Sequence, residues 1–179
     1  MKIRWLVASF LVVFLVCGQE AAMGKGSSKS EQTHFSAEDS GVTKPVAIPE
    51  DVLAILREDD TVRLALKDGS TPAEKLPLSW FSASVIHLSG SDKSDLLVKG
   101  EAPILGANVT TFWIFGATDH GHELVLTAPA HDLVLQSARW KGHREIQMMS
   151  ATASNVSTVL YRFDGKRYAA FQEKSEQIH

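Results

Sequence analysis

Residues 119–123 gather two imidazoles and two carboxylates within five positions, and such side chains bind transition metals. On a β-strand, His120 and His122 would share one face because side chains alternate along a strand. A closed site needs further ligands, and the other obvious donors are His131 and His143. The same residues include a glycine between two apolar segments, which is typical of a hairpin turn. We therefore favour a solvated hairpin and keep a transition-metal site as the alternative.

The sequence offers no complete catalytic constellation. It has no Gly-x-Ser-x-Gly motif, and Asp132 beside His131 is adjacency in the chain rather than evidence of a dyad. Cys17 is the only cysteine and lies in the N-terminal apolar segment. The acidic residues are scattered, without the paired carboxylates of a glycosidase. We therefore expect no enzymatic activity and no catalytic residues.

A basic turn that carries a tryptophan stands out. Trp140 lies in the sequence Arg-Trp-Lys-Gly-His-Arg at positions 139–144. A large ring in so basic a turn is hard to bury, and exposed aromatic and arginine side chains are typical of binding surfaces. The alternative is a simple solvated hairpin, because aromatic residues in short strands are more often cross-strand partners. The predicted binding surface consists of Arg139, Trp140, Lys141, Arg144, Arg162, Lys166 and Arg167.

The charge balance argues against nucleic acid as a partner. The 179 residues include 18 basic and 21 acidic side chains, for a net charge of −3. Loss of Lys2 and Arg4 with an export signal would leave 16 basic residues and a net charge of −5. Nucleic-acid binding relies on clustered lysine and arginine, so an acidic domain is not suited to it.

Residues 1–18 have the layout of a secretory signal peptide. Lys2 and Arg4 precede an apolar run of about 12 residues, which is shorter than the roughly 20 needed to span a bilayer. Val16 and Gly18 suit the −3 and −1 positions of a signal peptidase site, which places the cleavage before Gln19. The sequence thus predicts export to the periplasm or the extracellular space.

Cys17 offers an alternative, because a cysteine that closes an apolar run can be lipidated in a bacterial lipoprotein. Val16 stands where such signals usually have a small residue, so ordinary cleavage is the favoured interpretation. Lipidation would be the protein's contact with a membrane. Neither cut leaves a second cysteine, so the mature chain has no disulfide.

Three regions follow the signal. Residues 19–44 are rich in Gly, Ser and Lys, which predicts a disordered tether. Residues 45–174 form a single mostly β domain with one N-terminal helix over 45–60, and residues 175–179 are a C-terminal tail. Residues 62–66 alternate between apolar and other side chains and either continue the helix or start a strand. The predicted antiparallel meander has about eight short strands, at 81–88, 95–99, 110–115, 123–127, 133–138, 145–150, 157–163 and 168–171.

An internal repeat divides the predicted strands into two units. Asn108 and Asn155 each open an Asn-Val-Ser/Thr-Thr sequence that leads into an aromatic and aliphatic strand. The offset of 47 residues is in the range of four-stranded repeat units such as propeller blades. The repeat therefore suggests two four-stranded, blade-like meanders.

Residues 81–98 resemble the FG-GAP or VCBS-type repeat of integrin α-chains and many secreted bacterial proteins, in which an acidic loop precedes an Asp-Leu-hydrophobic strand. Segments at 106–109, 112–115, 123–126 and 161–168 look like a group of small exported bacterial proteins of unknown function. The resemblance covers residues 49–171 and implies propeller-type units and a calcium-binding loop. The positions that carry it are Phe81, Ala83, Ile86, Leu88, Gly90, Lys93, Asp95, Leu96, Leu97 and Val98.

The resemblance also assigns ligand positions for calcium. The acidic ligands of such a loop correspond to His87, Ser89, Ser91 and Asp95, and Asp92 stands where the repeat commonly has glycine. Calcium takes about 6 to 8 oxygen ligands, several of them carboxylates. The weak candidates Ser89, Ser91, Asp92 and Asp95 make a poor set, so a polar turn is favoured, no cofactor is expected, and calcium is the alternative.

These observations predict a non-enzymatic binding or accessory module of the bacterial cell envelope, whose partner is an envelope protein or a glycan. The first alternative is a calcium- or metal-dependent adhesion-type module. The second is an envelope hydrolase or a hydrolase inhibitor.

Overall fold

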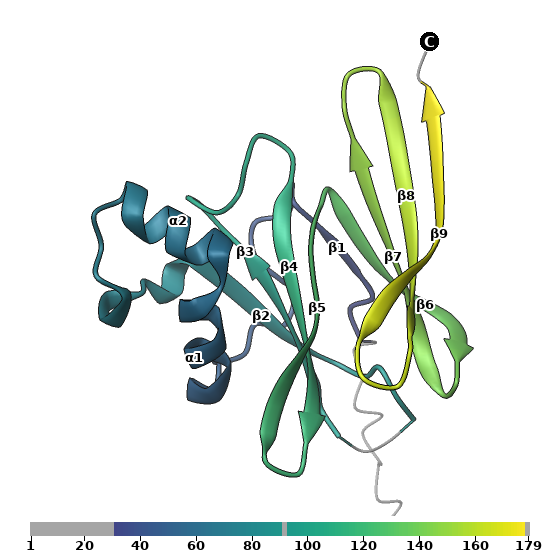
Figure 1. Cartoon of the computed structure of the whole chain (residues 1–179), viewed down its shortest axis with the longest axis horizontal. Helices are drawn as coiled ribbons and strands as arrows, with labels where there is room; N and C mark the ends of the chain where they lie inside the picture. The colour runs from purple at the N-terminus through teal and green to yellow at the C-terminus, as the bar shows by residue number, and fades with distance from the viewer. Residues whose placement is uncertain (1–30, 91–92, 178–179) are drawn as a thin grey trace, which may run out of the picture. The chain divides into compact units, whose positions relative to one another are not determined.

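The computed structural model describes residues 31–90 and 93–177, and this part of the chain is mostly β (Figure 1). The strands lie in two antiparallel sheets, which confirms the predicted fold class. The strands of the described part are β1 (His34–Ser36), β2 (Phe81–Ile86), β3 (Asp95–Gly100), β4 (Thr110–Thr118), β5 (Gly121–Ala130), β6 (Asp132–Trp140), β7 (His143–Ala151), β8 (Asn155–Phe163) and β9 (Tyr168–Gln177).

Each sheet contains one four-stranded meander. The smaller sheet has the order β2-β3-β4-β5, and the larger has the order β1-β6-β7-β8-β9. All eight predicted strands are present. The repeated Asn-Val sequences lead into β4 and β8, which are each the third strand of their meander.

Strand β9 is longer than the sequence indicates. It continues to Gln177, through part of the predicted C-terminal tail, because β8 pairs with it from Asn155 to Phe163. The polar residues at 172–177 gave no apolar alternation from which a strand could be predicted.

Two helices precede the first meander, where the sequence suggested one. These are α1 (Glu50–Glu58) and α2 (Asp60–Asp68), and two short 3-10 turns, η1 (Ala73–Lys75) and η2 (Leu78–Trp80), follow them. Asp59 has an extended backbone that ends α1, and its Oδ1 accepts the N–H groups of Thr61 at 2.9 Å and Val62 at 3.4 Å. An aspartate that accepts these otherwise unpaired donors is a favourable N-cap, so a second helix begins here.

The alternation at 62–66 is thus helical rather than extended. Val62 and Leu66 are buried, four residues apart on one face of α2, whereas Leu64 is 60% exposed.

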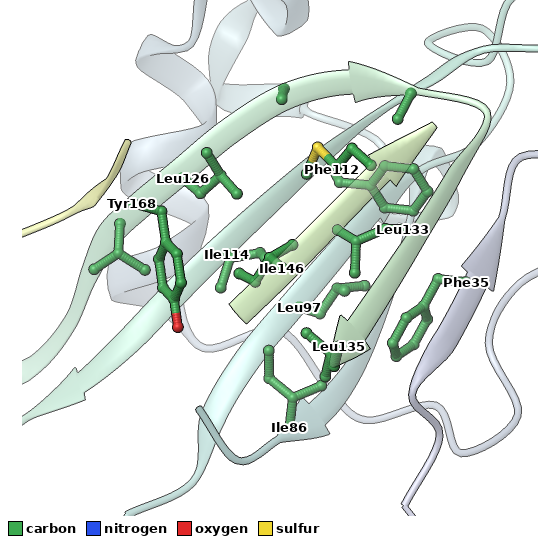
Figure 2. Packing of buried hydrophobic residues seen from close by; sticks show 14 of the residues in the cluster. Phe35, Ile86, Leu97, Phe112, Ile114, Leu126, Leu133, Leu135, Ile146 and Tyr168 are labelled. Carbon is green, nitrogen blue, oxygen red and sulfur yellow. The ribbon is translucent and has the colours of Figure 1, made fainter. Parts of the chain in front are cut away.

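Strand β4 is buried on both faces, and each face belongs to a different hydrophobic cluster. Phe112 and Ile114 pack in the cluster formed by the inner faces of the two sheets (Figure 2). Trp113 and Phe115 point the other way, into a cluster with α1 and α2. The architecture is therefore helices, small sheet and large sheet in successive layers, with the two meanders sharing one core.

Residues 34–36 differ from the tether expected over 19–44. They form β1, which pairs with β6, and Phe35 is buried between the sheets. The side chain of Lys99, which is fully buried, donates to the carbonyl oxygens of Ser36 at 3.1 Å and Asp39. A buried aromatic side chain and a row of backbone acceptors thus help to dock this arm, which composition alone does not show.

Several expectations concern parts outside the described residues. These are the signal peptide at 1–18, Cys17, the first part of the tether at 19–30, and loop residues Ser91 and Asp92. Within residues 31–90 and 93–177, no helix is long and apolar enough to cross a membrane.

Candidate functional site

The loop between β2 and β3 uses its aspartate for structure. Asp95 is 6% exposed, and its Oδ2 accepts the backbone N–H of Leu88 at 2.8 Å while its Oδ1 accepts that of Ala117 at 2.9 Å. Both carboxylate oxygens therefore hold neighbouring backbone segments together. Calcium binding through Asp95 would compete with these two bonds, so the loop is not the strongest site in the molecule.

The histidines of the β4–β5 turn point to separate partners. His122 donates its backbone N–H to Asp51 Oδ2 at 2.8 Å, and its Nδ1 lies 2.9 Å from the same oxygen. His120 donates its backbone N–H to the Thr118 hydroxyl at 3.1 Å. The described residues contain no group of three or more His, Cys, Asp or Glu side chains placed to hold a metal ion.

Asp51 is the first-turn carboxylate of α1 and ties that helix to the β4–β5 turn. The hydrogen bond from His122 lowers the pKa of Asp51 below its ordinary value. Gly121 has a φ of +121°, and a Cβ atom there would lie 2.5 Å from Asp51 Oδ2. Glycine is therefore required both by the backbone conformation and by the close approach of the carboxylate.

His131 and Asp132, adjacent in sequence, do not form a pair. His131 Nδ1 lies 2.8 Å from the carbonyl oxygen of Asn108, and Asp132 Oδ1 lies 3.3 Å from His34 Nε2. Each side chain ties a different segment to the start of β6.

The basic turn is the two-residue connection between β6 and β7. Lys141 and Gly142 both have positive φ, 49° and 82°, as a type I′ hairpin turn requires. Asn and Gly are the residues favoured at such positions, so the backbone of Lys141, at the first position of the turn, is strained. Trp140, just before the turn, is 43% exposed.

Two of the predicted surface arginines have structural partners. Arg144 donates from Nε to the Gln136 carbonyl at 2.8 Å, from Nη2 to the Leu135 carbonyl at 2.7 Å, and from Nη1 to Glu31 at 3.0 Å. Arg139 donates to the carbonyl of Leu88 at 3.0 Å. These bonds support β6 where its pairing with β7 is interrupted, so these guanidinium groups are largely committed to the fold.

Arg162 is different, because its guanidinium lies between two exposed aromatic rings. Its Cζ is 4.6 Å from the centroid of the Trp140 ring and 3.5 Å from that of Phe171, which is 57% exposed. Arg162 Nε donates to Glu145 Oε1 at 2.5 Å. We call Trp140, Arg162 and Phe171 the aromatic–arginine stack. It joins β6, β8 and β9 across the outer face of the large sheet.

The sequence did not single out Phe171 as a surface residue. The pairing of β8 with β9 shifts between Leu160 and Tyr161, so β9 carries one extra residue there. Such a bulge re-aims side chains and brings Phe171 over Arg162. A single aromatic residue within a polar strand was the available signal.

The turn between β8 and β9 adds further positive charge beside the stack. Asp164 accepts the backbone N–H groups of Lys166 at 2.7 Å and Arg167 at 2.9 Å. These bonds, with smaller contributions from the charges of Arg167 and Lys141, lower the pKa of Asp164. Lys141 follows Trp140 directly in the chain, and Arg167 lies two residues before Ala169, the register partner of Arg162, so both charges lie at the same end of the sheet as the stack. Lys166 instead lines a cleft with Phe163 and Tyr168.

The outer face of the large sheet continues from the stack as a shallow hollow of about 360 Å³. Leu160 lies two residues before Arg162 on β8 and so shares its face. Gln147 and Gln172 flank Leu160 on β7 and β9, since both are its register partners. The rest of the lining is Val156, Thr158, Lys174 and Glu176. We call this surface the sheet hollow.

A second cleft, of about 430 Å³, lies where Leu88, Val125, Phe163 and Tyr168 meet. Its rim includes Lys93, whose Nζ is 2.8 Å from Asp119 Oδ1, and His143, which stacks on Phe163 at 4.2 Å between ring centroids. Burial raises the pKa of Tyr168, and its hydroxyl donates to the Arg144 carbonyl at 2.9 Å. The polar groups that the cleft buries are thus bonded within the protein.

Comparisons with models of protein families, with curated proteins and with solved structures found no match to this chain. The resemblance to FG-GAP or VCBS-type repeats accordingly stays a prediction. The chemistry of the site rests on the geometry of its own residues.

Proposed function

We propose that this protein is a non-enzymatic binding module of the cell envelope, and that its binding surface is the aromatic–arginine stack with the basic residues beside it. The observation that carries the proposal is the position of Arg162 between the exposed rings of Trp140 and Phe171. Arginine, tryptophan and other aromatic side chains dominate the energetics of binding surfaces.

The rigidity of the stack supports this function over a merely solvated sheet face. Glu145 fixes the Nε of Arg162, and the guanidinium carbon packs 4.6 and 3.5 Å from the two ring centroids, so little side-chain entropy remains to be lost on binding. Trp140 on β6 and Phe171 on β9 also stay half-exposed at positions where smaller polar residues would suffice for folding. The export expected from residues 1–18 makes the envelope the setting of this proposal.

The test is retention of a cell-envelope fraction by the purified, immobilised protein. We expect Trp140→Ala and Phe171→Ala each to reduce retention at least tenfold, because each removes one wall of the stack. Leu64→Ala is the matched control, since Leu64 is 60% exposed on α2, away from the large sheet. Equal retention by all three variants would overturn the proposal.

A further inference from the structure

The guanidinium of Arg162 has one edge left for a ligand. Glu145 takes the Nε–H, the Cζ atom lies over the rings of Trp140 and Phe171, and no other hydrogen bond to this group is formed within residues 31–90 and 93–177. The Nη groups are therefore free to donate. Paired N–H donors in a fixed plane match the two oxygens of a carboxylate.

The charges around this edge favour an anion. Lys141, next to Trp140, and Arg167, two residues before the register partner of Arg162, add two positive charges at this end of the sheet, against the negative charges of Glu145 and Asp164. This is a local positive patch on a chain whose net charge is −3. Such a patch attracts an acidic ligand and repels a basic one.

The sheet hollow beside the stack indicates that the ligand is also rich in hydroxyl groups. Its lining includes the amides of Gln147 and Gln172 and the hydroxyl of Thr158, and Gln136 donates to Gln147 at 3.0 Å within the same face. The core of a protein–protein interface is more apolar than this surface. Amide and hydroxyl groups that both donate and accept suit the hydroxyls of a sugar.

From these three observations we infer that the aromatic–arginine stack and the sheet hollow together bind an acidic polysaccharide that contains uronic acid units. The rings of Trp140 and Phe171 provide apolar surface for the C–H faces of pyranose rings. Arg162 pairs with a uronate carboxylate, and the sheet hollow takes the neighbouring sugar unit. This inference rests on the proposed function and names its ligand class.

Titration calorimetry with oligogalacturonate as the probe tests this inference. We expect the purified protein to bind it, to bind a neutral dextran oligomer of equal length at least tenfold more weakly, and to lose affinity as salt is raised. Arg162→Lys keeps the positive charge but loses the planar pair of N–H donors, so the affinity for oligogalacturonate should fall at least tenfold. Arg63→Lys on α2 is the matched control and should leave affinity unchanged. Phe171→Ala, at an exposed position, gives a second test if Arg162→Lys disturbs the fold.

Poly-L-glutamate separates a sugar from an acidic peptide. If it binds as tightly as oligogalacturonate, and with the same dependence on Arg162, the polysaccharide assignment is overturned while the binding surface stands. If neither probe binds but envelope retention still depends on Trp140, the ligand class alone is overturned. If neither probe binds and retention is also independent of Trp140, the proposed function fails too.

Discussion

At the residue scale, charged side chains that suggest a site in the sequence divide into two groups by their partners. Asp95, Arg139 and Arg144 bond to backbone groups and hold the fold together. Arg162 bonds to one carboxylate and is otherwise directed at exposed rings. Arg139 bonds through Nη1 alone, so what distinguishes Arg162 is the pair of exposed rings at its guanidinium.

Asp95→Asn tests the structural role of the β2–β3 loop. The new amide would present a donor to a backbone N–H, so one of the two buried N–H groups would lose its acceptor. We expect the free energy of unfolding to fall by about 1–3 kcal/mol in urea denaturation. Asp119→Asn is the matched control, because the Asp119 side chain is 83% exposed and its partner among the described residues is the exposed Lys93. Equal stability of the two variants would contradict this role.

At Lys141, the residue that best suits the fold differs from the residue that best suits binding of an acidic ligand. Asparagine tolerates the positive φ of this position better than lysine, so Lys141→Asn should raise the unfolding free energy by up to about 1 kcal/mol. The same change removes a positive charge from beside Arg162, so affinity for oligogalacturonate should fall several-fold. Thermal unfolding and calorimetry on one preparation measure both effects. A variant that neither gains stability nor loses affinity would show that Lys141 has no part in the site.

Much of this residue-scale grouping could be predicted from the sequence. The basic turn and the Asp-Gly hairpin marked Trp140 and Arg162, whose side chains the structure brings together. The commitment of Arg139 and Arg144 to carbonyl oxygens could not be predicted, because it depends on an interruption in strand pairing. Phe171 was missed for a similar reason, since the bulge in β9 that re-aims it has no signature in the sequence.

At the element scale, the strands follow from apolar alternation, and their boundaries depend on partners. The run Phe-Trp-Ile-Phe at 112–115 is typical of a strand buried on both faces, and β4 is such a strand. The break between α1 and α2 depends on one capping side chain, Asp59. Its Oδ2 also accepts the indole N–H of Trp113 at 2.9 Å, so the cap is tied to β4.

The contact between α1 and the β4–β5 turn should make stability depend on pH. The pKa of Asp51 is lowered in the folded state, chiefly by the hydrogen bond from His122. The folded state therefore gains stability from the ionised carboxylate above the unfolded pKa of about 4, and loses it as the pH falls through the lowered folded pKa.

Asp51→Asn should accordingly lower the melting temperature at pH 6 and have little effect at pH 2. Thermal unfolding of both proteins between these values measures the difference. A melting temperature difference that stays constant from pH 6 to pH 2 would show that the charge of Asp51 does not contribute.

At the scale of the whole molecule, two repeated meanders share a core that the N-terminal arm closes. The repeat at Asn108 and Asn155 predicted the two units. It could not predict that their inner faces would pack on each other, because the apolar runs in the sequence do not specify which surfaces meet. The arm was missed as well, since Phe35 is its single aromatic residue and many of its other contacts are made by backbone carbonyls and polar side chains such as Glu31.

Lys99 is the residue that connects this arm to the core. Lys99→Met would leave the Ser36 and Asp39 carbonyl oxygens without this donor and remove the ion pair with Glu101, and should cost roughly 3 kcal/mol of unfolding free energy. Hydrogen exchange of residues 34–41 should increase most. Lys67→Met, on an exposed position of α2, is the control. Unchanged exchange in the arm would contradict the closing role of Lys99.

The central claim is that ligand binds on the outer face of the large sheet, at Trp140, and not in the helix layer or the core. The most direct measurement is NMR of the tryptophan indole N–H groups during titration with oligogalacturonate. Trp113 is buried and bonded to Asp59, so its signal is an internal reference. We predict a saturable shift of the Trp140 signal with the Trp113 signal unmoved. A Trp140 signal that stays in place at saturating ligand, or moves no more than that of Trp113, would contradict the account.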